Sequence, residues 1–164
     1  MRLHTSSRLV MLCLLATCGG CRHDAAPAGV RHPRACDLLS AADVSAVLGA
    51  PIGKAIPEDS ETRTSCAYPP GEPGSYAQAD VAIEWTAAHK TTTDEQMAET
   101  FGGTAVGRQV AHRVDLGDGG VYGRDGELTF RSGDATITVT VPMRANSEAQ
   151  ALAIGKAVLR GLTR

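Results

Sequence analysis

Hydrophobic and polar residues form several periodic segments along the chain, which glycine and proline separate. Residues 79–86 (ADVAIEWT) alternate between apolar and polar side chains, a pattern that predicts a strand with one buried face. Residues 126–142 (GELTFRSGDATITVTVP) hold two runs of this kind around a Gly-Asp pair, which predicts a β-hairpin. Residues 62–68 (TRTSCAY) also have the composition of a strand. These segments together predict a sheet that is mostly antiparallel.

Helical periodicity appears in two segments before the hairpin. In residues 37–50 (DLLSAADVSAVLGA), Ser40 and Asp43 have the spacing of a capping box, and Gly49 is placed to end the helix. Residues 91–103 begin with threonines and acids and end with two glycines, the order that suits a helix and its dipole. Both segments therefore predict helices.

The C-terminal segment, residues 146–164, predicts an amphipathic helix with Asn146 or Ser147 as its cap. Its expected apolar face consists of Leu152, Gly155, Val158, Leu159 and Leu162. Helices and strands together predict an α+β domain of about three helices and roughly five to seven strands. The chain of 164 residues has room for one such domain, which we place at residues 35–164.

Residues 1–21 have the features of a bacterial export signal. Arg2 and Arg8 supply a basic start, and the uncharged apolar run at residues 9–16 (LVMLCLLA) follows. A helix that spans a bilayer needs about 20 apolar residues, so this run is too short to cross a membrane. It suits the hydrophobic region of a signal peptide instead.

The sequence Cys18-Gly-Gly-Cys21 follows the apolar run, and several kinds of site share this spacing. A thioredoxin-like redox motif should follow a strand within a folded α/β unit, and the residues before it do not predict a strand. A c-type haem site requires histidine next to the second cysteine, a position that Arg22 occupies. A zinc site would need a second tight pair of ligands, which the sequence lacks. A lipoprotein signal therefore fits best.

The peptidase for such signals cuts before a diacylated cysteine and favours a small residue beside the cut. We expect Cys21 to be lipidated because Gly20 precedes it, although Cys18 stands where the signal usually has leucine. Cys18 is the alternative, with Leu15 in place but the bulkier Thr17 beside the cut. Two acyl chains on one cysteine would hold a soluble domain at a membrane surface without a transmembrane helix.

Residues 22–34 (RHDAAPAGVRHPR) are rich in alanine and proline and lack periodicity, so they predict a flexible tether. His23 and His32 lie in this tether, and solvated linker histidines explain them better than metal capture. These features predict a protein that is lipid-anchored to a membrane of the bacterial cell envelope and faces the periplasm. A plain secretory cut after Ala28 would instead give a soluble periplasmic or secreted protein.

Cys36 and Cys66 are the only cysteines in the expected domain. Disulfides persist in oxidising compartments, so export favours a bond between them that closes a loop of about 30 residues. The alternative is a pair of free buried thiols. A disulfide would help a domain with few aromatic residues, whose core must rest on Ala, Val, Leu and Ile.

The formal net charge of −2 leaves no basic field for nucleic acid. The motifs of phosphate-binding loops and of the nucleophile elbow do not occur in the chain. Acids do gather among glycines near the middle of the expected domain, but their spacing differs from that of a calcium loop, and turn formation explains them: Asp115, Asp118, Asp125 and Glu127. The sequence therefore predicts neither a metal nor a cofactor.

His89 and His112 are the only histidines in the expected domain. Asp115 is near His112, so a Ser-His-Asp assembly can be drawn, but almost any domain of this size offers such a set. A periplasmic small-ligand carrier or hydrolase that uses His112 or His89 is therefore the alternative hypothesis for function.

The segments CDLLSAADVSAVLGAPIG, SCAYPPG and DLGDGGVYG, followed by the last hairpin and helix, resemble a family of small bacterial envelope lipoproteins of unknown function. Members share a Cys-x-Leu-Leu-Ser/Thr opening helix, a Cys-x-Tyr strand and a late Leu-Gly-Asp turn. The resemblance covers residues 35–163 and implies exposure at the envelope and a disulfide between Cys36 and Cys66. It supplies no catalytic residues.

The leading hypothesis is therefore a non-enzymatic lipoprotein whose domain binds an envelope component or a protein. One version is an inhibitor or immunity role against an enzyme that enters the periplasm. An exposed acidic patch of Glu58, Asp59 and Glu61 would then suit a basic partner.

Overall fold

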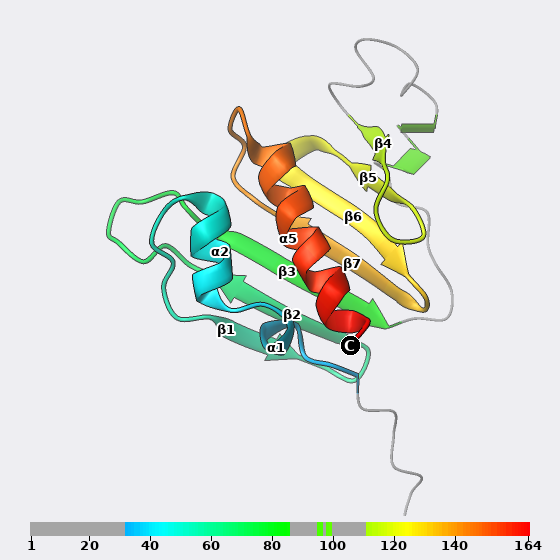
Figure 1. The fold of residues 1–164 in the computed structure, drawn as a ribbon, viewed down its shortest axis with the longest axis horizontal. Helices are drawn as coiled ribbons and strands as arrows, with labels where there is room; N and C mark the ends of the chain where they lie inside the picture. The colour runs from blue at the N-terminus through cyan, green and yellow to red at the C-terminus, as the bar shows by residue number, and fades with distance from the viewer. Residues whose placement is uncertain (1–31, 86–94, 97, 100–110) are drawn as a thin grey trace, which may run out of the picture. The chain divides into compact units, whose positions relative to one another are not determined.

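Seven strands form one antiparallel sheet in the computed structural model, which describes residues 32–85, 95–96, 98–99 and 111–164. These strands are β1 Ile56–Asp59, β2 Arg63–Tyr68, β3 Ala79–Trp85, β4 His112–Val114, β5 Gly120–Tyr122, β6 Glu127–Ser132 and β7 Ala135–Thr140. Their spatial order is β1-β2-β3-β7-β6-β5-β4 (Figure 1). The longer described helices are α1 Ala35–Leu38, α2 Ala41–Leu48 and α5 Ser147–Leu162. The predicted α+β class with an antiparallel sheet is confirmed.

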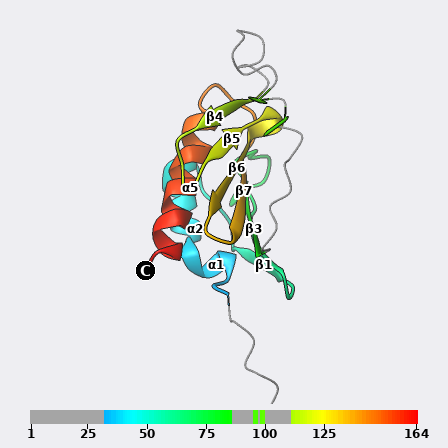
Figure 2. The ribbon, with the colours of Figure 1, turned by 90° about the vertical axis from the view of Figure 1, so that its right-hand side faces the viewer.

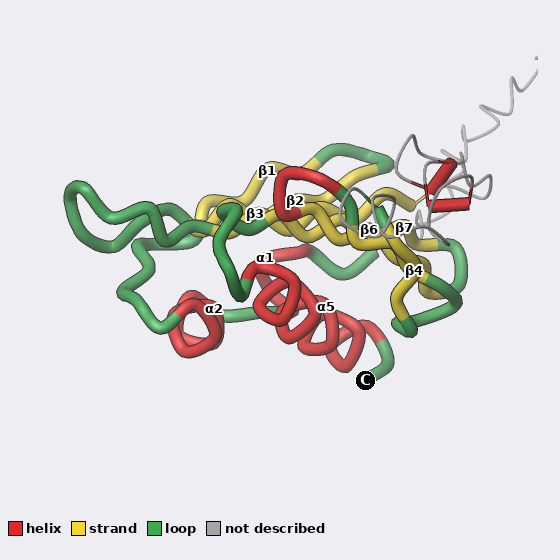
Figure 3. The backbone as a smooth tube through the Cα atoms, turned by 90° about the horizontal axis from the view of Figure 1, so that it is seen from above, coloured by secondary structure: helices red, strands yellow, loops and turns green. Residues whose placement is uncertain are grey.

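All three helices lie against the same face of the sheet, as Figures 2 and 3 show. The alternation predicted for β3 has this cause: Val81 and Ile83 are fully buried, whereas Asp80 and Glu84 are exposed on the other face. The core therefore lies between one face of the sheet and the helices. The polar positions of the strands belong to the opposite face, which none of α1, α2 and α5 covers and which we call the uncovered face.

The predicted hairpin is formed by β6 and β7. Leu128 pairs with Val139 and Phe130 pairs with Ile137, so the expected side chains face each other across the two strands. The loop between β4 and β5 packs on β6 at Gly117, where a Cβ atom would overlap the carbonyl oxygen of the residue opposite. Gly117 also has a φ of 60°, which only glycine adopts at low cost.

α2 begins and ends as the sequence predicts. The Asp43 amide donates to Ser40 Oγ, and the Ser40 amide donates to Asp43 Oδ2, which completes the capping box. Gly49 ends the helix with a left-handed φ of 69°. The helix predicted for residues 91–103 lies largely outside the described residues, although Glu95–Gln96 and Ala98–Glu99 are helical.

The stripe of α5 that faces the sheet differs from the predicted one. Leu152, Leu159 and Leu162 are only partly buried, at the edges of the contact. The cause is steric: at Gly155, a Cβ atom would lie 2.9 to 3.1 Å from bulky side chains of β6 and of the loop before β5. Small helix residues meet large sheet residues here, and the buried stripe is Ser147, Gln150, Ala151, Ile154, Gly155 and Val158.

His32, which the sequence assigns to the tether, belongs to the same compact unit as the residues that follow it. The His32 ring stacks on the Trp85 ring with centroids 4.3 Å apart, and Arg34 Nε donates to Asp59 Oδ2 at 2.8 Å. His32 is therefore held against the domain, which differs from the solvated linker residue that the sequence suggests. The expected signal peptide, most of the tether, and the candidate lipidation sites Cys18 and Cys21 lie outside the described residues.

Candidate functional site

Two bonds from β2 fix α1 in place. Cys36 and Cys66 form the predicted disulfide. Tyr68, two residues further along β2, donates a hydrogen bond from its hydroxyl to Leu39 O at 2.7 Å. Residues two apart on a strand point to the same face, so Cys66 and Tyr68 both reach the segment at α1. This geometry gives the Cys-x-Tyr pattern a physical role, which is to anchor the opening helix.

Tyr68 is fully buried under this segment. Burial, with a smaller contribution from the negative charge of Asp43, raises the pKa of the Tyr68 phenol to about 12. The hydroxyl therefore stays protonated in the folded protein and keeps its role as donor to Leu39 O. The anchor is a neutral, desolvated hydrogen bond.

α5 is joined to the other helices by contacts that sequence periodicity does not reveal. The Gln150 side-chain amide donates to Val47 O at 3.5 Å and to Leu48 O at 3.4 Å, two carbonyl groups at the end of α2. At the other end of α5, Gly161 lies against Leu38 so closely that a Cβ atom would be 3.1 Å from the leucine side chain. The helix layer is thus closely packed at both ends.

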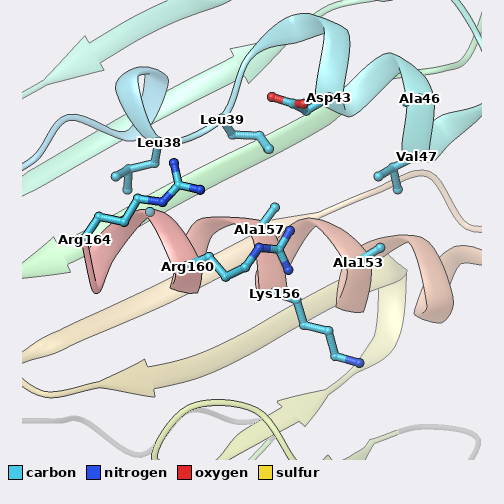
Figure 4. Close-up of a pocket in the computed structure, with 11 residues that line it drawn as sticks. Leu38, Leu39, Asp43, Ala46, Val47, Ala153, Lys156, Ala157, Arg160 and Arg164 are labelled. Carbon is cyan, nitrogen blue, oxygen red and sulfur yellow. The ribbon is translucent and has the colours of Figure 1, made fainter.

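Between these two junctions the helices leave a groove of about 620 Å³, with α1 and α2 on one side and α5 on the other. Its volume lies in the range of ligand sites in proteins, roughly 300 to 1,000 Å³. We call this cavity the helix groove. Figure 4 shows the side chains that line it. They are Leu38, Leu39, Asp43, Ala46, Val47, Ala153, Lys156, Ala157, Arg160, Gly161 and Arg164.

Three cations and one acid share the rim of the helix groove: Lys156 and Arg160 on α5, Arg164 just beyond its end, and Asp43 on α2. In Figure 4 the Arg164 side chain extends toward α1, Arg160 lies along α5, and Lys156 points away from α1 and α2. The Asp43 carboxylate is engaged within α2, and its hydrogen bonds from the Ser40 hydroxyl and amide lower its pKa. The groove therefore combines an apolar floor with a positive rim.

A second cavity of about 320 Å³ lies on the uncovered face of the sheet and includes Glu58, Arg63 and Asp80. Loss of hydration among the neighbouring strands raises the pKa of the Asp80 carboxyl. Cations and acids are mixed here, so the cavity has no charge of one sign. It gives a weaker indication of a ligand class than the helix groove.

The three acids that the sequence suggests as one patch, Glu58, Asp59 and Glu61, lie in different surroundings. Glu58 and Asp59 are consecutive residues of β1 and therefore point to opposite faces of the sheet. Asp59 forms an ion pair with Arg34, whereas Glu58 lines the second cavity. Glu61 lies in the turn after β1, and all three acids are exposed.

His112 lies beside an acid, but the acid is Glu148 at the start of α5 and not Asp115. His112 Nε2 is 2.9 Å from Glu148 Oε1, and a quarter of the histidine side chain is exposed. The nearby Ser147 hydroxyl is 2.8 Å from the Tyr122 hydroxyl and donates to Arg144 O at 2.9 Å. Ser147 thereby joins the start of α5 to β5, and this pairing differs from the Ser-His contact of a serine hydrolase.

Two of the acids among the glycines, Asp118 and Asp125, have the turn roles that the sequence suggests, whereas Glu127 begins β6. Asp118 Oδ2 accepts a hydrogen bond from the Gly133 amide at 2.7 Å. Asp125 has a φ of 63°, a conformation that aspartate tolerates better than most residues. Among the residues that the structure describes, no three His, Cys, Asp or Glu side chains are grouped as a metal site would require.

The remaining predictions from the sequence are not tested by the structure. His89 lies outside the described residues, so its surroundings do not enter the site. No helix within the described ranges has both the length and the apolar character of a membrane span. Comparisons with models of protein families, with curated proteins and with solved structures found no match for this chain. The resemblance to envelope lipoproteins therefore stays a prediction.

Proposed function

We propose that this chain is an exported, lipid-anchored lipoprotein of the bacterial envelope whose domain binds a partner without catalysis. The observation that carries the binding role is the helix groove, because it joins an apolar floor to unpaired cations. Within the described residues, neither Arg160 nor Arg164 forms a salt bridge, although both line the groove. An inhibitor or immunity role is one version of this function.

Two further observations support export. The apolar run at residues 9–16 and the cysteines after it have the order of a lipoprotein signal. The Cys36–Cys66 disulfide suits an oxidising compartment outside the cytoplasm. Lipidation at Cys21, or alternatively at Cys18, would keep the domain at the membrane while the helix groove faces the periplasm.

Site-specific photo-crosslinking in intact bacteria tests the binding role. A photoreactive residue replaces Ala46, which is exposed and lines the helix groove. The control variant carries it at Thr136, on the uncovered face of the sheet. We expect one recurrent adduct from Ala46 that the Thr136 variant does not form.

The two contradicting results are distinct. Adducts from Thr136 alone would indicate that the partner binds the sheet and not the helix groove. A lack of any adduct at either position, with the protein present in the membrane fraction, would contradict a binding role altogether. Substitution of His112 by alanine should leave the Ala46 adduct unchanged, because this residue does not line the groove.

A further inference from the structure

We infer that the helix groove binds an acidic, apolar-bearing peptide segment of a partner protein, whose carboxylates pair with Arg160 and Arg164. This inference rests on the proposed binding function and names the chemistry of the partner. It reverses the charge expected from the sequence alone, where the acids near β1 suggest a basic partner.

Local charge supports an acidic occupant. The whole chain carries 18 acids and 16 Lys and Arg residues, so its overall charge is slightly negative. The groove has the opposite balance, with three cations and one acid, and that acid already accepts two hydrogen bonds within α2. A carboxylate that enters the groove therefore meets cations that have no partner among the described residues.

The two arginines of the groove indicate which chemical group the partner presents. A guanidinium presents a planar set of donors that matches a carboxylate in a bidentate arrangement. Arg160 lies in the last turn of α5, and Arg164 follows two residues after the helix ends at Leu162, with both side chains at the groove. Carboxylates four residues apart on a partner helix are about 6 Å apart along its axis, and those two apart on a strand are about 6.6 Å apart. A peptide with acids at either spacing therefore offers neighbouring carboxylates to the two arginines that line the groove.

The apolar floor of the groove favours a peptide with apolar side chains between these carboxylates. Leu38, Leu39 and Val47 line one side, and Ala153 and Ala157 line the other. Filling this surface with leucine-sized side chains removes apolar area from water on both partners, which favours binding. Apolar residues and paired acids together define the proposed motif.

A peptide fits the groove better than a lipid surface does. Cations that dock on a membrane need to project outward together, yet Arg164 extends toward α1 while Lys156 points the opposite way. The space they surround lies between helices, so an occupant must enter it with side chains instead of lying flat across it. Binding to anionic vesicles is therefore the competing outcome of the test.

Selection from a random peptide library displayed on phage, with the full-length protein as bait, tests this inference. We expect enrichment of sequences with acids spaced by two or four residues and with apolar residues between them. Calorimetry with the most enriched peptide should give an affinity that falls at least about tenfold in Arg160→Glu/Arg164→Glu. Arg113→Glu, an exposed charge reversal on β4, is the matched control and should bind normally.

Three results would overturn the inference: enrichment of basic or purely apolar peptides, binding of acidic peptides that the double variant retains, and no enrichment at all. Vesicles of phosphatidylcholine and phosphatidylglycerol provide the lipid arm, and binding that only vesicles show would assign the groove to lipid. Circular dichroism of both variants checks that they fold. The outcome is separable from the proposed function, since acidic peptides could bind a chain that is neither exported nor lipidated.

Discussion

Removal of the Cys36–Cys66 bond should lower the free energy of unfolding by about 3 to 4 kcal/mol. The bond closes a loop with a sequence separation of 30. In the chain-entropy description, cross-linking a loop of this length removes roughly 12 cal/mol/K of entropy from the unfolded ensemble, which is about 3.6 kcal/mol near room temperature. Small domains are stable by about 5 to 15 kcal/mol, so this loss would be a large share of the total.

The assay compares urea unfolding of the oxidised protein with that of the double variant Cys36→Ser/Cys66→Ser. Urea lowers the stability of a small domain by about 1 to 3 kcal/mol per molar, so the expected loss moves the unfolding midpoint by more than about 1 M. Reductant should destabilise the wild type in the same way. Its addition to the double variant is the control, and should change nothing.

A loss below about 1 kcal/mol would refute this reasoning, because it would mean that the unfolded chain gains little freedom when the bond is absent. The structure also predicts where the effect begins. α1 has only four residues and is held by the disulfide and by the Tyr68 hydrogen bond. Amide exchange near α1 should therefore accelerate on reduction more than exchange in β3 and β7.

Tyr68→Phe should cost about 1 to 3 kcal/mol because it leaves a buried carbonyl unpaired, whereas Tyr76→Phe, at a residue that is 78% exposed, should cost almost nothing in urea unfolding. Because the pKa of Tyr68 is raised to about 12, the wild type should lose stability as the pH rises above 10.0, and Tyr68→Phe should remove this part of the loss. Because the pKa of Asp43 is lowered from its ordinary value of 3.8, its ionised carboxylate stabilises the fold above that pH, and this contribution is lost as the pH falls below it. Asp43→Asn should therefore flatten the dependence of the urea midpoint on pH below 3.8. Gly117→Ala should lower the melting temperature more than Gly74→Ala, because both residues have positive φ but only Gly117 has a carbonyl in the way.

Local signals account for much of the fold. The Ser40–Asp43 cap, the end of α2 at Gly49 and the β6–β7 hairpin depend on residues close together in sequence, and their chemistry is visible there. The disulfide could also be predicted, because Cys36 and Cys66 are the only cysteines available in the domain.

The remaining features depend on contacts between distant residues. Gln150 bonds to carbonyl groups about a hundred positions earlier in the chain, and no local pattern marks it. The sequence pattern assigns the leucines of α5 to its buried face. The structure buries smaller residues there, because large side chains of the sheet lie close to Gly155. The helix groove depends on the close approach of Leu38 to Gly161, a contact between distant residues. From the sequence alone, the arginines at its rim are indistinguishable from ordinary solvated charges near the end of a helix.

The mass of the intact protein recovered from bacterial membranes, with and without reductant, tests export and anchoring most directly. We predict a chain that begins at Cys21, or at Cys18, carries acyl groups on that cysteine, and gains one pair of hydrogen atoms on reduction as the Cys36–Cys66 bond opens. An uncleaved, unacylated chain that retains its apolar run and all five cysteines in reduced form would contradict the account.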